Sequence, residues 1–260
     1  MDLGLKGKVA LVTGSSRGIG RSIAETLADE GCDLLLTGRD QAMLDETAAA
    51  IRSKGRKAVI VNIDLREERA PATLIEAVQR ELGRLDVLVN NAGTTKRGDF
   101  FALTDADWEE GYALKFFAHM RLARAAWPLL KERRGSLIAI AGTSGRKPDK
   151  SFTIGSSVNA AVAAFTKCLA DLGKQDGVQV NCIHPSLVET ERQWRRIRGE
   201  IERTGEPEAK IRERLCQETG IIRFGKVEDV ADLATFIVSS RGTWLTGATI
   251  DLDGGEIPVL

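Results

Sequence analysis

Cysteine is scarce in this sequence, and aromatic side chains are few. The four cysteines lie far apart along the chain, and none belongs to a Cys-x-x-Cys pair. This spacing excludes the common zinc-site and disulfide frameworks and is typical of free thiols in a reducing compartment. We therefore expect a cytoplasmic protein without a metal site. Tyrosine is rarer still, because Tyr112 is the only one in 260 residues.

The sequence also lacks an excess of charge and any long apolar run. Lysine and arginine together number 37, as do aspartate and glutamate, so nothing favours nucleic acid or an anionic membrane as a partner. No stretch is apolar over the length needed to cross a bilayer, and the first ten residues do not resemble a signal peptide. A composition of 43% hydrophobic and 28% charged residues predicts one globular domain over 1–260.

Glycine, by contrast, is concentrated in one motif near the beginning of the chain. An apolar run at 9–12 predicts a buried strand that ends at Gly14, and Gly18 and Gly20 follow directly before a helical pattern. A strand, a glycine turn and a helix N-terminus in this order bring backbone N–H groups and the positive end of a helix dipole toward an anion. The stretch therefore predicts the phosphate-binding turn of a nucleotide site.

Strand and helix patterns alternate along the rest of the chain. This alternation indicates a parallel sheet covered by helices on both faces, a doubly wound α/β domain. In the charged stretch 189–218, Trp194, Ile197 and Ile201 share one helical face, which predicts one or two amphipathic helices. The expected strands are 9–12, 32–37, 57–63, 85–89, 136–141, 178–183 and 249–252, and the later helices are 104–131, opened by a capping box, 157–174 and 227–239.

The chain resembles the short-chain dehydrogenase/reductase family over nearly its whole length. The resemblance rests on the glycine turn at 13–20, on Asp64, on the Asn-Asn-Ala-Gly segment at 90–93 and on the Leu-Asp-Gly-Gly segment at 252–255. It implies a single Rossmann domain with a seven-stranded sheet and a substrate lid at about 187–220. It also implies a homodimer or homotetramer that acts on a small-molecule substrate.

The resemblance further implies which residues hold a nicotinamide cofactor. The glycine turn would bind the phosphates, the segment after the third strand the adenine, the segment at 91–93 the ribose, and Val188 and Thr190 the nicotinamide carboxamide. The full set is Gly14, Ser16, Arg17, Gly18, Ile19, Gly20, Arg39, Asp64, Leu65, Asn91, Ala92, Gly93, Val188 and Thr190.

The end of the second strand indicates which nicotinamide cofactor is used. NAD-binding members usually have an acidic residue there, whereas this chain has Gly38 followed by Arg39. Because Arg17 and Arg39 could both pair with a 2′-phosphate, we predict NADP, with NAD less favoured. Two alternatives stay open: Asp40 could neutralise Arg39, or both arginines could be solvated surface charges.

The catalytic half departs from the family pattern. The family uses a Tyr as acid/base, a Lys four residues later, a Ser thirteen residues before the Tyr, and an Asn in the long helix. Aligned through its flanks, this chain has Gly155, Asn159, Gly142 and Lys115 at those four positions. None of the four family residues is present, and the lysine and the asparagine have exchanged places.

Lys115 is the ionisable group that remains among these positions. Desolvation would lower its pKa toward a useful range, so we predict Lys115 as an acid, or as the residue that orients a water, with Asn159 and Ser144 beside it. A purely space-filling role for Lys115 stays open. Weaker candidates for the missing chemistry are His184, which could shuttle a proton, and the hydroxyls of Thr143, Ser156 and Ser157.

Three functions fit these residues. The first is an NADP-dependent oxidoreductase that interconverts a carbonyl and a hydroxyl with a non-standard proton donor. The others are a cofactor-binding protein without redox turnover and a non-redox, hydrolase-like or lyase-like enzyme on the same scaffold. Four arginines of the lid could meet an anionic substrate, but the glutamates among them favour a solvated helix face. The four arginines are Arg192, Arg195, Arg196 and Arg198.

Overall fold

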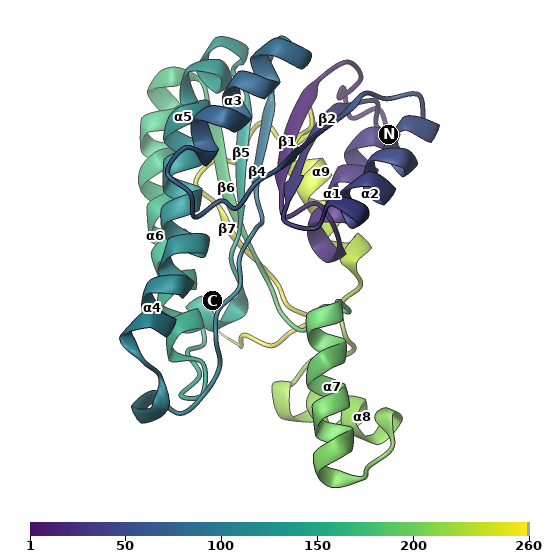
Figure 1. Cartoon of the computed structure of the whole chain (residues 1–260), viewed down its shortest axis with the longest axis vertical. Helices are drawn as coiled ribbons and strands as arrows, with labels where there is room; N and C mark the ends of the chain where they lie inside the picture. Colours follow the sequence, from purple (N-terminus) through teal and green to yellow (C-terminus); the bar gives the residue numbers. More distant parts are fainter. Residues whose placement is uncertain (259–260) are drawn as a thin grey trace.

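Seven parallel strands form one sheet in the computed structural model, which describes residues 1–258 (Figure 1). The strand order is β3-β2-β1-β4-β5-β6-β7, so the chain winds outward first on one side of β1 and then on the other. This order confirms the predicted doubly wound α/β fold. The strands are β1 (Val9–Thr13), β2 (Asp33–Gly38), β3 (Ala58–Asn62), β4 (Val87–Asn90), β5 (Ser136–Ile140), β6 (Gln179–Pro185) and β7 (Thr249–Leu252).

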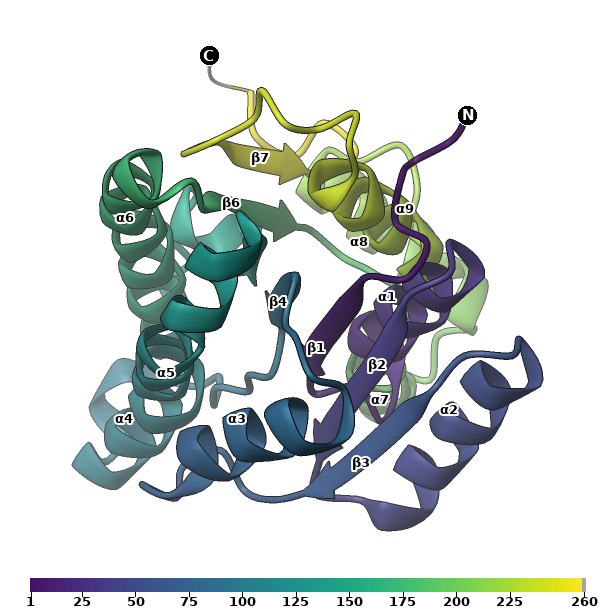
Figure 2. The ribbon, with the colours of Figure 1, turned by 90° about the horizontal axis from the view of Figure 1, so that it is seen from above.

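Helices cover both faces of the sheet, as Figure 2 shows from above. One apolar core lies between the strands and α1 (Gly18–Asp29), α2 (Gln41–Ser53) and α9 (Val227–Val238). A second core lies on the opposite face, under three further helices. The strands are apolar on both faces because each side is covered in this way. The helices of the second face are α3 (Ala70–Glu81), α5 (Ala118–Arg133) and α6 (Thr153–Asp176).

The long helix predicted over 104–131 forms with an interruption. It begins as α4 (Asp105–Tyr112), where Thr104 and Asp107 form the expected capping box. A π-helical segment at Ala113–Phe117 follows, and α5 continues from it. Wider π turns of this kind are frequent at functional sites, and this one contains Lys115.

The helix predicted over 157–174 begins four residues earlier than expected, at Thr153. The expectation was wrong because the Ser- and Gly-rich segment before it has no helical periodicity to read. As a result Gly155 lies in the first turn of a helix, and it is buried there.

The charged stretch forms two helices, α7 (Glu191–Thr204) and α8 (Glu208–Thr219), which project beyond the carboxyl ends of the strands in Figure 1. A small apolar cluster that includes Ile197, Ile211 and Phe224 holds them together. Among the described residues, no helix has both the length and the apolar character needed to span a membrane.

Candidate active site

A cavity of about 1260 Å³ lies at the carboxyl ends of the strands, beside the point where the strand order reverses between β1 and β4. This is the place at which open α/β sheets bind ligands. The structure brings all fourteen predicted cofactor-binding residues to its walls. The three predicted catalytic residues, Lys115, Ser144 and Asn159, line the same cavity.

The glycine turn requires glycine at three positions. Gly14 and Gly18 have φ angles of +65° and +58°, in the left-handed region that side chains disfavour. A Cβ on Gly20 would lie 2.3 Å from the carbonyl oxygen of Gly14. Arg17, the N-cap of α1, makes no side-chain cap, so the first N–H groups of the helix stay open to an anion. The turn therefore fits the phosphates of a dinucleotide.

Hydrogen bonds join the turn after β1 to the loop after β4. The Thr13 hydroxyl accepts from the backbone N–H groups of Asn91 and Ala92, at 2.9 and 3.0 Å. The Asn91 amide donates to the Thr13 carbonyl oxygen at 2.8 Å and to that of Gly14 at 3.3 Å. These bonds fix the two loops against each other and so set the width of the cavity between them.

Arg39 is not neutralised by its neighbour in the sequence. The Asp40 carboxylate caps α2 by accepting the N–H of Met43 at 3.2 Å. Among the described residues, Arg39 instead has a loose ion pair of 3.8 Å with Asp64, and its side chain is 61% exposed. Asp64 is held chiefly by Arg66, whose hydrogen bonds lower the pKa of that carboxyl group. The Arg39 guanidinium thus stays available to a ligand at the cavity wall.

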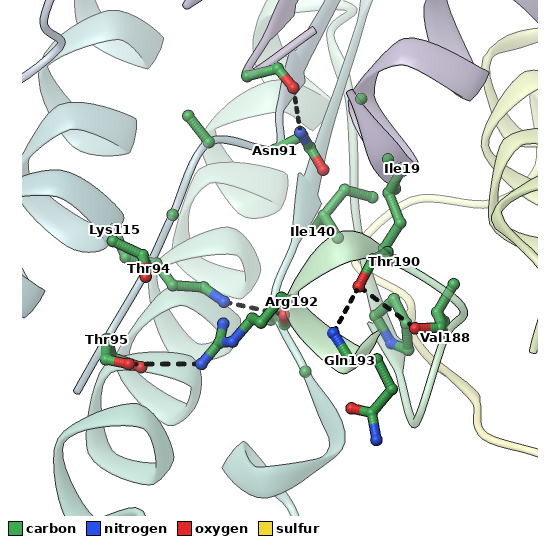
Figure 3. A pocket seen from close by; sticks show the side chains of 18 of the residues that line it. Ile19, Asn91, Thr94, Thr95, Lys115, Ile140, Val188, Thr190, Arg192 and Gln193 are labelled. Carbon is green, nitrogen blue, oxygen red and sulfur yellow. Dashed lines mark hydrogen bonds between the residues drawn. The ribbon is translucent and has the colours of Figure 1, made fainter. Parts of the chain in front are cut away.

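Lys115 reaches into the cavity from the π-helical segment (Figure 3). Its ammonium group donates a hydrogen bond of 3.0 Å to the carbonyl oxygen of Ala141. Gly93 makes room for it, because a Cβ there would lie 2.8 Å from Cδ of Lys115. Burial of the ammonium, with a smaller contribution from the Arg192 guanidinium, lowers the pKa of Lys115 to about 7.

Asn159 and Ser144 form a pair beside this lysine. The Asn159 amide donates to the Ser144 hydroxyl at 2.9 Å. Its carbonyl oxygen is buried and has no hydrogen-bond partner among the described residues, and such an unpaired acceptor is costly. A Cβ on Gly142 would lie 3.0 Å from the Asn159 amide nitrogen, so the asparagine occupies the space next to this glycine.

Phe152 occupies the space that a side chain at position 155 would need. A Cβ on Gly155 would lie 2.1 Å from Cε1 of the Phe152 ring. The guanidinium groups of Arg97 and Arg192 lie 4.4 and 5.5 Å from the centre of the same ring. No motif marks Phe152 or Arg97, and the sequence reasoning missed both. The one available signal was a bulky ring three residues before an unexpected glycine.

Of the weaker candidates, His184, Ser156 and Ser157 lie outside the cavity. His184 is completely buried, its Nδ1 lies 2.9 Å from the Gly142 carbonyl oxygen, and burial lowers its pKa. The Ser156 hydroxyl accepts from the N–H of Asp149, and the Ser157 hydroxyl donates to the Ile154 carbonyl. Thr143 does line the cavity wall. The structure therefore brings Lys115, Asn159 and the hydroxyls of Thr143 and Ser144 together at the cavity, whereas His184 does not line it.

Comparisons with known proteins agree with this architecture. The model of the short chain dehydrogenase family matches residues 8–200. L-Sorbose reductase from Gluconobacter frateurii, solved with NADPH and L-sorbose, is 32% identical and superposes over 100% of both chains with a TM-score of 0.96. A 3-oxoacyl-(acyl-carrier-protein) reductase from Aquifex aeolicus is 31% identical over 98% of this chain and 99% of its own. The 2,3-dihydro-2,3-dihydroxybenzoate dehydrogenase of Bacillus subtilis is 28% identical over 97% of each.

The contact between Gly155 and Phe152 gives a prediction about stability. Gly155→Ala should lower the free energy of unfolding by about 1–3 kcal/mol, because the new methyl group overlaps the Phe152 ring. In a Phe152→Ala background the same change should cost much less, which a double-mutant cycle by urea denaturation measures. Gly199→Ala is the matched control, since a Cβ there would touch nothing within 4 Å. Equal costs in both backgrounds would contradict the overlap.

The environment of Lys115 gives a prediction about pH. Between pH 7 and 10.5 the folded protein releases a proton that the unfolded chain keeps, so folding becomes more favourable as pH rises. The free energy of unfolding of the wild type, minus that of Lys115→Met, should rise by about 1.4 kcal/mol per pH unit between pH 8 and 10. Below pH 6 it should be constant. The exposed Lys150→Met serves as control, and a difference that is flat across the range would refute the buried ammonium.

Proposed function

This chain belongs to the short-chain dehydrogenase family, and from that premise we propose that it is an NADP-dependent oxidoreductase that interconverts a carbonyl and a hydroxyl on a small substrate. The observation that carries the proposal is the position of Lys115. Its ammonium group enters the cavity lined by every residue of the predicted cofactor set, and the carbonyl of Ala141 holds it there. Lys115 takes the part of the proton donor in this proposal.

The cofactor-binding residues fit NADP by charge and by shape. The glycine turn and the first N–H groups of α1 would hold the phosphates, and Arg17 and Arg39 would bind the 2′-phosphate. A nicotinamide cofactor supplies the hydride chemistry that side chains cannot. In support, the similar L-sorbose reductase was solved with NADPH.

The chain's own residues would handle the proton. The Lys115 ammonium has three N–H bonds, and the Ala141 carbonyl takes one, so two are free to bind the substrate oxygen. During reduction Lys115 would give a proton to this oxygen and then regain one from water. During oxidation the neutral amine would take the hydroxyl proton. A pKa of about 7 suits both directions.

Asn159 would position the reacting group. Its amide is already bound to Ser144, and its unpaired carbonyl oxygen can accept a hydrogen bond from a substrate hydroxyl or a water. Asn159 and Lys115 together would offer one acceptor and two donors beside the substrate. This set replaces the tyrosine, lysine and serine that the family pattern expects.

One specific observation favours the alternative of cofactor binding without turnover. The Phe152 ring fills the space next to Gly155, so that position offers no proton donor. The non-redox alternative has less support, since the Ser144 hydroxyl accepts from an amide, which is not a base. Turnover of a carbonyl substrate with NADPH, or its absence despite tight NADPH binding, separates the first two functions.

The role of Lys115 is tested by pH–rate profiles. In the reduction direction kcat should fall as pH rises through about 7, because the donor loses its proton. In the oxidation direction kcat should rise over the same interval. Lys115→Met should lower kcat by about 10²–10⁴-fold and remove both transitions.

Two further variants complete this test. Lys115→Arg keeps the charge but does not titrate in this range, so it should also lose both transitions. Lys150→Met should leave the profiles unchanged. Unaltered profiles in Lys115→Met would show that the lysine only fills space.

The choice of cofactor is tested by binding. NADPH should bind more tightly than NADH, as followed by the fluorescence of the reduced nicotinamide. Arg17→Ala and Arg39→Ala should each weaken NADPH binding by about 10- to 100-fold, since each removes a charge-assisted contact of about 1.5–3 kcal/mol. NADH, which lacks the 2′-phosphate, is the matched control and should change little. Tighter binding of NADH by the wild type would reject the assignment.

A further inference from the structure

The arginines of helix α7 divide into two groups. Arg195 and Arg198 do not line the cavity and pair with Glu191, at 3.4 and 2.6 Å. Arg192 and Arg196 are four residues apart, hence on one helix face, and both line the cavity. The solvated helix face expected from the sequence therefore describes only the first pair.

Arg192 and Arg196 have no carboxylate partner. Among residues 1–258, neither guanidinium forms an ion pair; the one polar contact of Arg192 is a bond of 3.4 Å to the Thr95 carbonyl oxygen (Figure 3). Glu200, on the same helix as Arg196, is held by Arg203 and Arg214 instead. Two guanidinium groups without an ion-pair partner in the described part of the chain thus lie at a cavity wall.

Other cations add to this positive potential. The Arg97 guanidinium lies on the same ring of Phe152 as that of Arg192, and it forms an ion pair with Asp149. Burial, followed by repulsion from Arg97, lowers the pKa of both lid guanidinium groups. Lys115 lies near enough to Arg192 for their charges to repel. Such an arrangement is costly without an anion to neutralise it.

We propose that the substrate carries a terminal carboxylate or phosphate group, and that Arg192 and Arg196 of the lid bind this oxyanion. The inference rests on the proposed function, because Lys115, which lines the same cavity, would receive the reacting carbonyl. Planar guanidinium groups match the paired oxygens of either anion.

Isothermal titration of the NADPH-saturated protein tests the proposal, since cofactor then covers Arg17 and Arg39 and hydroxyl compounds cannot be oxidised. D-Gluconate is compared with D-sorbitol, and glycerol 3-phosphate with glycerol, so that each anion has a neutral counterpart. At least one anion should bind about tenfold or more tightly than its counterpart, and the better pair identifies carboxylate or phosphate. Binding should weaken as salt is added. No preference for either anion would overturn the proposal.

Matched variants assign the effect to the lid. The double variant Arg192→Gln/Arg196→Gln should lose the preference for the anion by tenfold or more. Arg195→Gln/Arg198→Gln removes the same charge from the same helix but outside the cavity, and it should keep the preference. Equal losses in both doubles would show a general charge effect and overturn the proposal.

A failure of the proposed function would be visible separately. NADPH binding is measured first, and carbonyl reduction is assayed with each compound's keto form. Anion preference that depends on Arg192 and Arg196 but occurs without turnover would reject the oxidoreductase and keep the anion site. Turnover of neutral ketones but not of anionic ones would keep the oxidoreductase and reject the anion site.

Discussion

The position of the cavity depends on one set of hydrogen bonds, between the Thr13 hydroxyl and the backbone N–H groups of Asn91 and Ala92. These bonds cross the point where the strand order reverses, at which two neighbouring chain segments leave the sheet in opposite directions. They hold the glycine turn on one side and the Asn91–Gly93 segment on the other. Lys115 packs against this segment, and Arg17 occupies the N-cap position of the helix that follows the turn. Both halves of the proposed chemistry are therefore positioned by the same contact.

Around these hydrogen bonds, the predicted catalytic positions combine glycines with larger side chains that fill the space beside them. Each of three glycines adjoins a larger side chain that uses its space: Gly93 beside Lys115, Gly142 beside Asn159, and Gly155 beside Phe152. Because the interior is closely packed, a larger side chain at one of these glycines would require a change in the neighbouring side chain as well. The lysine, the asparagine and the phenylalanine thus belong to one arrangement of the cavity wall. The space beside each of the three glycines is therefore occupied and not left as a void.

The sequence was sufficient for the sheet, the glycine turn and the family, because periodicity and turn chemistry are local properties. It also placed Lys115, Asn159 and Ser144 in one site through the resemblance. It could not reveal Phe152 beside Gly155, since that contact depends on the path of the loop after β5. The division of the lid arginines was readable in principle: Arg192 and Arg196 are one turn apart, while Arg195 and Arg198 lie four and seven residues after Glu191. The assembly state and the cellular compartment stay predictions.

The N-terminal turn of helix α7 connects the predicted cofactor site with the proposed anion site. Thr190 is its N-cap, and the Thr190 hydroxyl accepts a hydrogen bond from the N–H of Gln193. The Thr190 side chain also adjoins the glycine turn, because a Cβ on Gly18 would lie 3.5 Å from its Cγ2 atom. Arg192 lies in the first turn of the same helix. A molecule seated on the glycine turn and one held by the lid arginine therefore share a single helical turn as their common wall. By thermodynamic linkage, whichever of them steadies that turn raises the affinity for the other by the same factor. The predicted cofactor site and the proposed anion site would then be coupled, although their ligands would occupy different parts of the cavity.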